Sequence, residues 1–211
     1  MTHIKITEAN KYPTQCLKRD PEARHMYTSG EIKILTVEEY HKLRDAIPKP
    51  EYKTKLDILL ITGMRYEEYL RLYSHPELYL EKRNIIHLSG EAQKKARRKQ
   101  PERTIQPLPS MFSYLLKDFW QAHRPPCESV WNRDLQRWAK RAGISPYGLS
   151  AKTTRKSIES WQVAAGIPET TICLRAGHDS LTSMRHYQGL AFSDDEIRDI
   201  QKQLKLWGIL K

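Results

Sequence analysis

The chain has 211 residues, with 36 Lys and Arg against 25 Asp and Glu, which gives a net charge of +11. Its 39% hydrophobic and 29% charged residues predict one substantial folded domain and exclude a fully disordered chain. The longest nearly apolar stretch, Leu56 to Ile61, contains Asp57 and is far shorter than the roughly 20 residues of a membrane span. The N-terminal residues lack the apolar block of a signal peptide, which predicts a cytoplasmic protein.

The cysteine and histidine spacings predict no metal site. Cys16, Cys127 and Cys173 lie far apart with no C-x-x-C pair, and no H-E-x-x-H motif occurs. The excess positive charge favours a polyanionic partner such as nucleic acid, with a merely basic protein as the alternative. Its uneven distribution supports a binding surface, because Lys94 to Arg103 (KKARRKQPER) is strongly basic whereas Ser193 to Asp199 is acidic.

The first predicted elements are an arm and three helices. Residues 1–34 show no clear period and predict an N-terminal arm or linker, with the folded domain spanning 35–211. A capping box at Thr36 and Glu39 predicts a helix that ends before Pro48. The next helix is predicted over 52–61 and ends at Gly63, so that Arg65 begins the third helix, 65–73, close to unpaired backbone N–H groups.

A β-hairpin is predicted next, followed by further helices. The strands are 85–88 and 104–108, and the basic run between them lies at the tip, where it could enter a DNA groove. Helices follow at 110–123, 129–142, 150–165 with Ser150 as cap, 168–175, 181–187, and from the Ser193/Glu196 capping box to Trp207. The apolar stripe of this last helix fits the core or a neighbouring protomer. The predicted fold class is therefore mainly α with a small antiparallel β-sheet (α+β).

Two short segments place groups that suit a phosphate at fixed spacings. Lys152 and Arg155 lie three residues apart, which puts them on one face of a helix. Ala176-Gly177-His178 is followed, nine residues after the histidine, by Tyr187. These side chains could converge on one anion.

These segments resemble the boxes of the tyrosine recombinases, or phage-type integrases, including those of archaeal viruses and plasmids. ITGMRYEEYLRL is similar to the family's T-G-[LM]-R-x-x-E-[LY]-x-x-L box, which assigns Arg65 as the first catalytic arginine and Glu68 as the supporting acid. The H/K-x-x-R box is matched by Lys152 and Arg155, and the L-G-H box by His178 with its tyrosine. The resemblance, from about Leu35 to Trp207, implies the catalytic-domain fold of this family.

The family also places a catalytic lysine on the hairpin, about eight residues before a proline on the return strand. Counting back from Pro107 selects Lys99, with Lys95 as the alternative and Lys94 as a weaker one. The neighbouring Lys94, Arg97 and Arg98 are predicted to bind DNA. A solvated lysine on the hairpin tip is the competing interpretation of Lys99.

The resemblance implies cleavage of DNA by a tyrosine nucleophile. Tyr187 would attack the scissile phosphate and form a 3′-phosphotyrosyl link, which conserves the bond energy without ATP. Arg65 and Arg155 would bind the non-bridging oxygens. The competing interpretations are that the two arginines are surface ion-pair partners and that the tyrosine packs in the core.

The remaining side chains would hold the phosphate and move protons. Lys99 would protonate the departing 5′ oxygen, while His178 and Lys152 would hydrogen-bond the phosphate, one of them helping to deprotonate the tyrosine. His178 could also be a satisfied, partly buried histidine. With so many cationic side chains, the resemblance implies no metal and no cofactor.

The resemblance further implies double-stranded DNA as partner and a dimer or tetramer on DNA, acting for a mobile element or virus. Family members usually carry a separate N-terminal clamp domain, so the chain is either a catalytic fragment or a short recombinase.

Two other functions stay open. One is an inactive DNA-binding module of the same fold, and the other is a DNA-relaxing enzyme like the type IB topoisomerases.

Overall fold

Helices make up most of the structure, a computed structural model that describes residues 27–29, 32–89, 102–177 and 192–211. The helices are α2 (Val37–Ala46), α3 (Pro50–Thr62), α4 (Tyr66–Ser74), α5 (Phe112–Gln121), α6 (Glu128–Arg141), α7 (Thr153–Ala164), α8 (Glu169–Ala176) and α10 (Asp194–Leu206). The strands β1 (Tyr27–Ser29) and β2 (Ile32–Ile34) form one antiparallel pair, and β3 (Tyr79–Leu80), β4 (Ile85–Leu88) and β5 (Arg103–Ile105) form a second antiparallel sheet in that order. Short 3-10 turns flank β3 at Pro76–Leu78 and Glu81–Arg83. The expected fold class, mainly α with a small antiparallel sheet, is confirmed.

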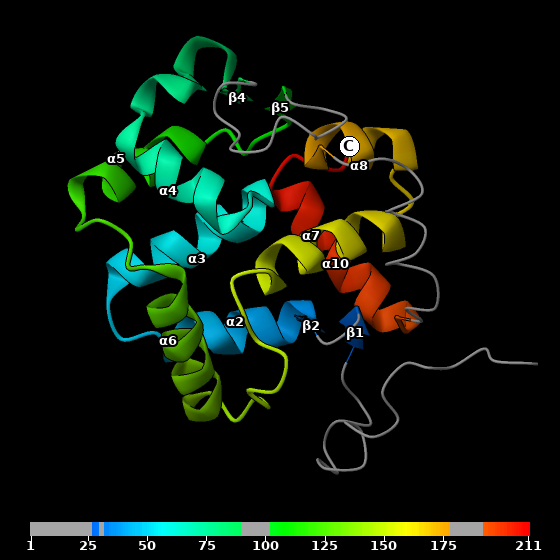
Figure 1. Cartoon of the computed structure of the whole chain (residues 1–211). Coiled ribbons are helices and arrows are strands. Elements are labelled where there is room, and N and C mark those ends of the chain that lie inside the picture. The colour runs from blue at the N-terminus through cyan, green and yellow to red at the C-terminus, as the bar shows by residue number, and fades with distance from the viewer. Residues whose placement is uncertain (1–26, 30–31, 90–101, 178–191) are drawn as a thin grey trace, which may run out of the picture.

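The helix α7 lies in the middle of the fold, where it contacts β2, α3, α8 and α10 (Figure 1). Its Trp161 is fully buried and donates a hydrogen bond from Nε1 to the carbonyl of Leu35 at 2.8 Å. The hydroxyl of Ser157 accepts the N–H of the same leucine at 2.9 Å. These bonds join segments far apart in the sequence, so α7 gives the second predicted box a rigid support.

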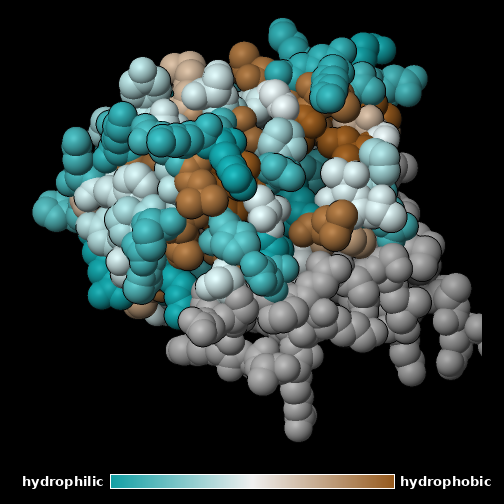
Figure 2. All heavy atoms as spheres, turned by 90° about the horizontal axis from the view of Figure 1, so that it is seen from above, coloured by the Kyte–Doolittle hydropathy of each residue, from teal (hydrophilic) through white to brown (hydrophobic). Residues whose placement is uncertain are grey.

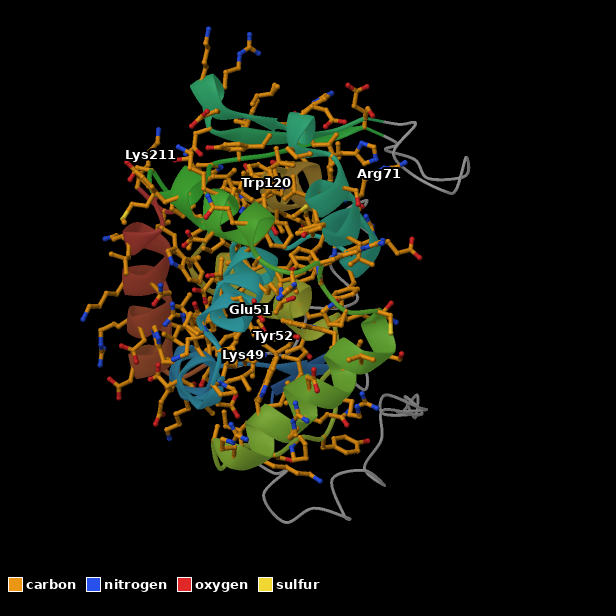
Figure 3. The ribbon with its side chains drawn as sticks, turned by 90° about the vertical axis from the view of Figure 1, so that its left-hand side faces the viewer. Lys49, Glu51, Tyr52, Arg71, Trp120 and Lys211 are labelled. Carbon is orange, nitrogen blue, oxygen red and sulfur yellow. The ribbon has the colours of Figure 1, made fainter. Side chains whose placement is uncertain are left out.

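Local signals define the start of α2 and the packing of α3. The capping box at Thr36 and Glu39 is confirmed, with each side chain accepting the backbone N–H of the other at 3.1 Å. In α3, the ring of Tyr52 packs against those of Trp131 and Trp138 of α6, with ring centroids 6.5 and 5.4 Å apart. Figure 3 labels Tyr52 together with Lys49 and Glu51 at this end of α3. This aromatic contact anchors the beginning of α3, the helix that leads into the first predicted box.

The predicted hairpin strands are present with shifted bounds. The first strand is confirmed as β4, whereas β5 begins at Arg103 and ends at Ile105. In the register, Leu88 lies opposite Arg103 and Ile86 opposite Ile105, so that all four side chains are buried. The short β3, which the sequence did not predict, completes the sheet. The side chain of Arg103 therefore points toward the protein interior although it closes the basic run.

The described part of the predicted N-terminal arm, residues 27–29 and 32–34, contains the β1–β2 pair, which the sequence did not predict. Three-residue strands are too short to show a period in the sequence. Ile34 is fully buried, and the buried ammonium of Lys33 lies 2.6 Å from a carboxylate oxygen of Glu39. The buried core thus already includes Lys33 and Ile34.

The last helix packs on its own chain. The capping box at Ser193 and Glu196 is confirmed. Beyond α10, Trp207 stacks on Trp161, with ring centroids 6.1 Å apart and planes 25° apart, and meets the edge of Tyr40 at 5.9 Å. The apolar stripe of this helix therefore belongs to the core of the same protomer.

The surface seen from above is mainly hydrophilic, and its apolar side chains form small separate groups (Figure 2). Within the described residues, no helix combines the length and apolar character that crossing a bilayer requires. The well-exposed large apolar residues include Met111 just before α5, Leu174 in α8 and Leu206 in α10.

Candidate active site

The turn between α3 and α4 sets the position of Arg65. The helix α3 stops because Gly63 adopts a left-handed conformation, with φ of 61°, and donates its N–H to the carbonyl of Leu59. A Cβ atom on Gly63 would lie 3.0 Å from Ile158 of α7, so the turn also packs closely on the central helix. Arg65 then becomes the N-cap of α4, which begins at Tyr66, one residue later than predicted.

Glu68 holds Arg65 in two ways. One carboxylate oxygen accepts the backbone N–H of Arg65 at 2.9 Å, and the other accepts its Nη1 at the same distance. Glu68 is buried, whereas the side chain of Arg65 is 30% exposed. The guanidinium of Arg65 is thus anchored by Glu68 on a side chain that remains partly exposed, which is compatible with the predicted role as a phosphate ligand.

Glu68 also binds Arg103, a residue that the sequence analysis did not select. The two Nη atoms of Arg103 donate to the two carboxylate oxygens at 3.2 and 2.6 Å, in a buried bidentate pair. Burial, partly offset by the charge of Glu68, lowers the pKa of Arg103 to about 10, so the guanidinium stays charged at neutral pH. The strand alternation around Ile105 was the available sequence signal, because it turns Arg103 inward.

The ionisation of Glu68 follows from these neighbours. Burial by itself would raise the pKa of this carboxyl group. The charges of Arg103, Arg65 and Arg155, together with the hydrogen bond from the backbone of Arg65, outweigh burial and hold the pKa below its ordinary value. Glu68 is therefore a carboxylate over the whole neutral range.

Arg155 connects the first box to the third. From the first turn of α7, its Nη1 donates to the carbonyl of Gly63 at 3.0 Å and its Nη2 to the carbonyl of Ala176 at 2.7 Å. Its Nε forms an ion pair with Glu159 at 3.0 Å. Two of the five N–H groups of the guanidinium thus donate to backbone carbonyls, one in each of two turns that are far apart in the sequence. The structure thus brings Arg155 to the turn that carries Arg65.

The start of α7 differs from the prediction. The helix begins at Thr153 rather than after a Ser150 cap, because Thr153 forms a local turn with Ser150: its hydroxyl accepts the N–H of Ser150 and its own N–H binds the Ser150 carbonyl. Lys152 therefore lies at the N-cap, exposed and one residue before the helix begins, and Arg155 lies in the first turn. Both residues still lie within one turn at the same end of the helix.

Several predicted residues lie outside the described residues. They are Lys94, Lys95, Arg97, Arg98, Lys99, His178 and Tyr187. The predicted helix 181–187 lies there too. The flanking elements β4, β5, α8 and α10 are described, and β5 and α8 contact each other. The roles of the seven residues outside the described ranges therefore stay predictions.

The described side chains create a site with excess positive charge. Three guanidinium groups, those of Arg65, Arg103 and Arg155, contact or act on two carboxylates, Glu68 and Glu159, and the charge of Arg103 also acts on a fourth guanidinium, that of Arg175. In a partly buried site such an excess favours an anion, and guanidinium forks match the geometry of a phosphate. Within the described ranges, no three His, Cys, Asp or Glu side chains cluster as metal ligands would.

Gly177 closes the site next to Arg103. It has φ of 68°, and a Cβ atom on it would lie 2.7 Å from Cδ and 2.8 Å from Nη1 of Arg103. We expect Gly177→Ala to destabilise the protein by about 2–3 kcal/mol, because left-handed strain adds to overpacking of a buried arginine. Urea unfolding measures this loss.

Gly166→Ala is the matched control for that substitution. Gly166 has φ of 78°, and a Cβ on it would meet nothing within 4 Å, so only the backbone strain of about 1 kcal/mol remains. Equal losses of stability in the two variants would show that the close contact with Arg103 adds nothing to the cost of Gly177→Ala.

Comparison with known proteins agrees with this arrangement. The sequence matches the phage integrase family over residues 33–194. The crystal structure of a XerA recombinase is similar, with a TM-score of 0.56 and 17% identity, over 85% of this chain and 65% of that chain. None of the curated proteins matches the sequence. The structural likeness shows the fold, and the family match spans most of the chain, which therefore belongs to the phage integrase family.

Proposed function

We propose that the protein is a site-specific DNA recombinase that cleaves and rejoins strands through a 3′-phosphotyrosyl intermediate. One observation carries the proposal: Arg155 of α7 donates to the carbonyl of Gly63, two residues before Arg65, so two arginines far apart in sequence meet at one turn. Membership of the phage integrase family supports it. The net charge of +11 supports double-stranded DNA as the partner.

In the proposed reaction, Tyr187 attacks the scissile phosphorus while the bond from phosphorus to the 5′ oxygen breaks. Arg65 and Arg155 bind the non-bridging oxygens and stabilise the charge that develops on them. The anchoring of Arg65 by Glu68 fixes the direction of its donors before the substrate arrives, which avoids reorganisation during the reaction. Rejoining reverses these steps and regenerates the free tyrosine.

The proton transfers fall to side chains near the phosphate. Lys99 gives its proton to the departing 5′ oxygen, and Lys95 is the alternative donor. His178 and Lys152 hydrogen-bond the phosphate, and one of them accepts the phenol proton of Tyr187 as it attacks. The exposure of Lys152 at the N-cap of α7 supports this assignment. We further propose that the enzyme acts as a dimer or tetramer on DNA and serves a mobile element or virus.

The test is a covalent capture that needs no knowledge of the target site. The protein is incubated in EDTA with a random-sequence library of nicked duplexes, and protein-linked DNA is precipitated with potassium and dodecyl sulfate, then sequenced. We expect an enriched sequence with wild type and none with Tyr187→Phe, because the phenol oxygen forms the link.

Tyr147→Phe is the matched control, since it removes a partly exposed phenol outside the predicted boxes. An adduct that persists in Tyr187→Phe would refute this nucleophile. Binding without any adduct would favour the inactive DNA-binding module, and adducts without sequence enrichment would favour a DNA-relaxing enzyme.

A further inference from the structure

The C-terminal end of α3 leaves a backbone carbonyl that its own helix does not satisfy. The carbonyl of Ile61 would bind the N–H of Arg65 if the helix continued. The chain turns at Gly63, however, and the N–H of Arg65 binds Glu68 instead. The last turn of α3 contains no basic residue, although carbonyls at a helix C-terminus attract positive charge.

Arg175 of α8 satisfies this carbonyl from a distant part of the chain. Its Nη2 donates to the carbonyl of Ile61, and its Nη1 donates to the carbonyl of Pro107 at 2.7 Å. The residue is 5% exposed, and no carboxylate within the described residues pairs with it. Burial, reinforced by the charge of Arg103, lowers its pKa to about 10.

A buried guanidinium without a carboxylate partner is an unfavourable way to fill a core, because the charge loses its hydration. An unbranched apolar side chain would occupy a similar space at no such cost. What the guanidinium adds is a fixed fork that can bind two carbonyls at once. The guanidinium therefore supplies a connection between two carbonyls that an apolar side chain cannot make.

We propose that Arg175 is a positioning residue that holds the three segments of the candidate active site in register. One segment is the end of α3, which leads to Arg65, and the second is the chain after β5, which follows Arg103. The third is α8 itself, which ends at Gly177 next to His178. This inference rests on the proposed recombinase function.

The guanidinium of Arg175 complements that of Arg155. Arg155 spans from Gly63 to Ala176, and Arg175 spans from Ile61 to Pro107, so the turn before Arg65 is held from α7 and from α8. The two arginines differ in their role. Arg155 binds the phosphate in the proposed reaction, whereas Arg175 is buried and does not touch the DNA in this assignment.

The test compares Arg175→Met, which removes both donor nitrogens, and Arg175→Lys, which keeps the charge on a single donor nitrogen, with Arg198→Met. Arg198 is exposed and pairs with Asp195 on the same helix. In single-turnover adduct formation at equal folded fraction, we expect Arg175→Met to be slowed about 100-fold, as misplacement of reacting groups by about 1 Å causes. DNA affinity should stay within about threefold of wild type, because no phosphate contact is lost.

A second measurement, hydrogen exchange of the backbone amides of residues 59–66, does not depend on activity. Exchange there should be about tenfold faster in Arg175→Met, intermediate in Arg175→Lys and unchanged in Arg198→Met, because local opening of the turn becomes easier. If Arg175→Met fails to fold, Arg175→Lys carries the test with the same two measurements.

Wild-type rates of cleavage and exchange in the folded variants would overturn the proposal. So would a loss of cleavage that only follows the unfolded fraction, since this indicates a merely structural residue. If the wild type itself forms no adduct, the recombinase function fails, and the exchange experiment still decides whether Arg175 holds the turn.

Discussion

Replacing Arg155 with alanine is expected to slow strand cleavage by about 1,000-fold or more while most DNA affinity remains. The substitution removes donors to the phosphate at the point where charge develops, which alone costs about 100- to 1,000-fold. It also releases the carbonyls of Gly63 and Ala176, which loosens the turn that positions Arg65. Affinity should fall less than about tenfold, because one phosphate contact is a small part of the electrostatic total.

Covalent capture gives the rate, and a salt titration of DNA binding gives the affinity. Arg155→Lys separates charge from geometry, since it keeps the positive charge without the planar fork. Arg198→Ala is the control for removing an exposed arginine. If Arg155→Ala cleaves at the wild-type rate, the assignment of the candidate active site is wrong.

The second large effect is expected from Glu68→Gln, which should reduce the free energy of unfolding by about 3–5 kcal/mol. The carboxylate is buried and shared by Arg65 and Arg103, so its removal leaves Arg103 charged and buried without a counter-ion. Urea unfolding at neutral pH measures the loss. Glu38→Gln, on an exposed pair with Lys42, should change the stability by less than about 1 kcal/mol.

The pH dependence provides an internal check on Glu68. Its folded pKa is held below the unfolded value of about 4.3, so its stabilisation is complete above that pH and is lost as the pH falls through the lower, folded pKa. Wild-type stability should therefore drop in acid, and the difference between wild type and Glu68→Gln should shrink there. A difference that stays constant down to acid pH would show that the carboxylate charge is not what stabilises the fold.

Sequence signals predict the local structure correctly where the hydrogen bonds that determine it lie within one element. The capping boxes at Thr36 and Ser193, and the turn at Gly63, depend on hydrogen bonds within a few residues, so the sequence predicts them correctly. Ser150 shows the limit of such signals, because Thr153 competes for the same local bonds and the helix begins later.

Arg103 and Arg175 could not be predicted in the same way. Charged residues are almost always exposed unless they are paired, so a basic residue beside a basic run is naturally assigned to the surface. The partner of Arg103 lies 35 residues away in the chain, and those of Arg175 lie 68 and 114 residues away. Only the tertiary fold brings these groups together, and it adds two arginines to the two that the boxes indicate.

The stacking of Trp207 on Trp161 gives the end of the chain an intrinsic optical signature. Two indole rings at this separation couple electronically, and their near-ultraviolet circular dichroism depends on their mutual orientation. A second tryptophan pair, Trp131 with Trp138, lies in α6. Trp207→Phe leaves that pair intact, so the difference from the wild-type spectrum gives the contribution of Trp207 and Trp161. Docking of α10 on its own protomer can therefore be followed on unlabelled protein, including while DNA is added.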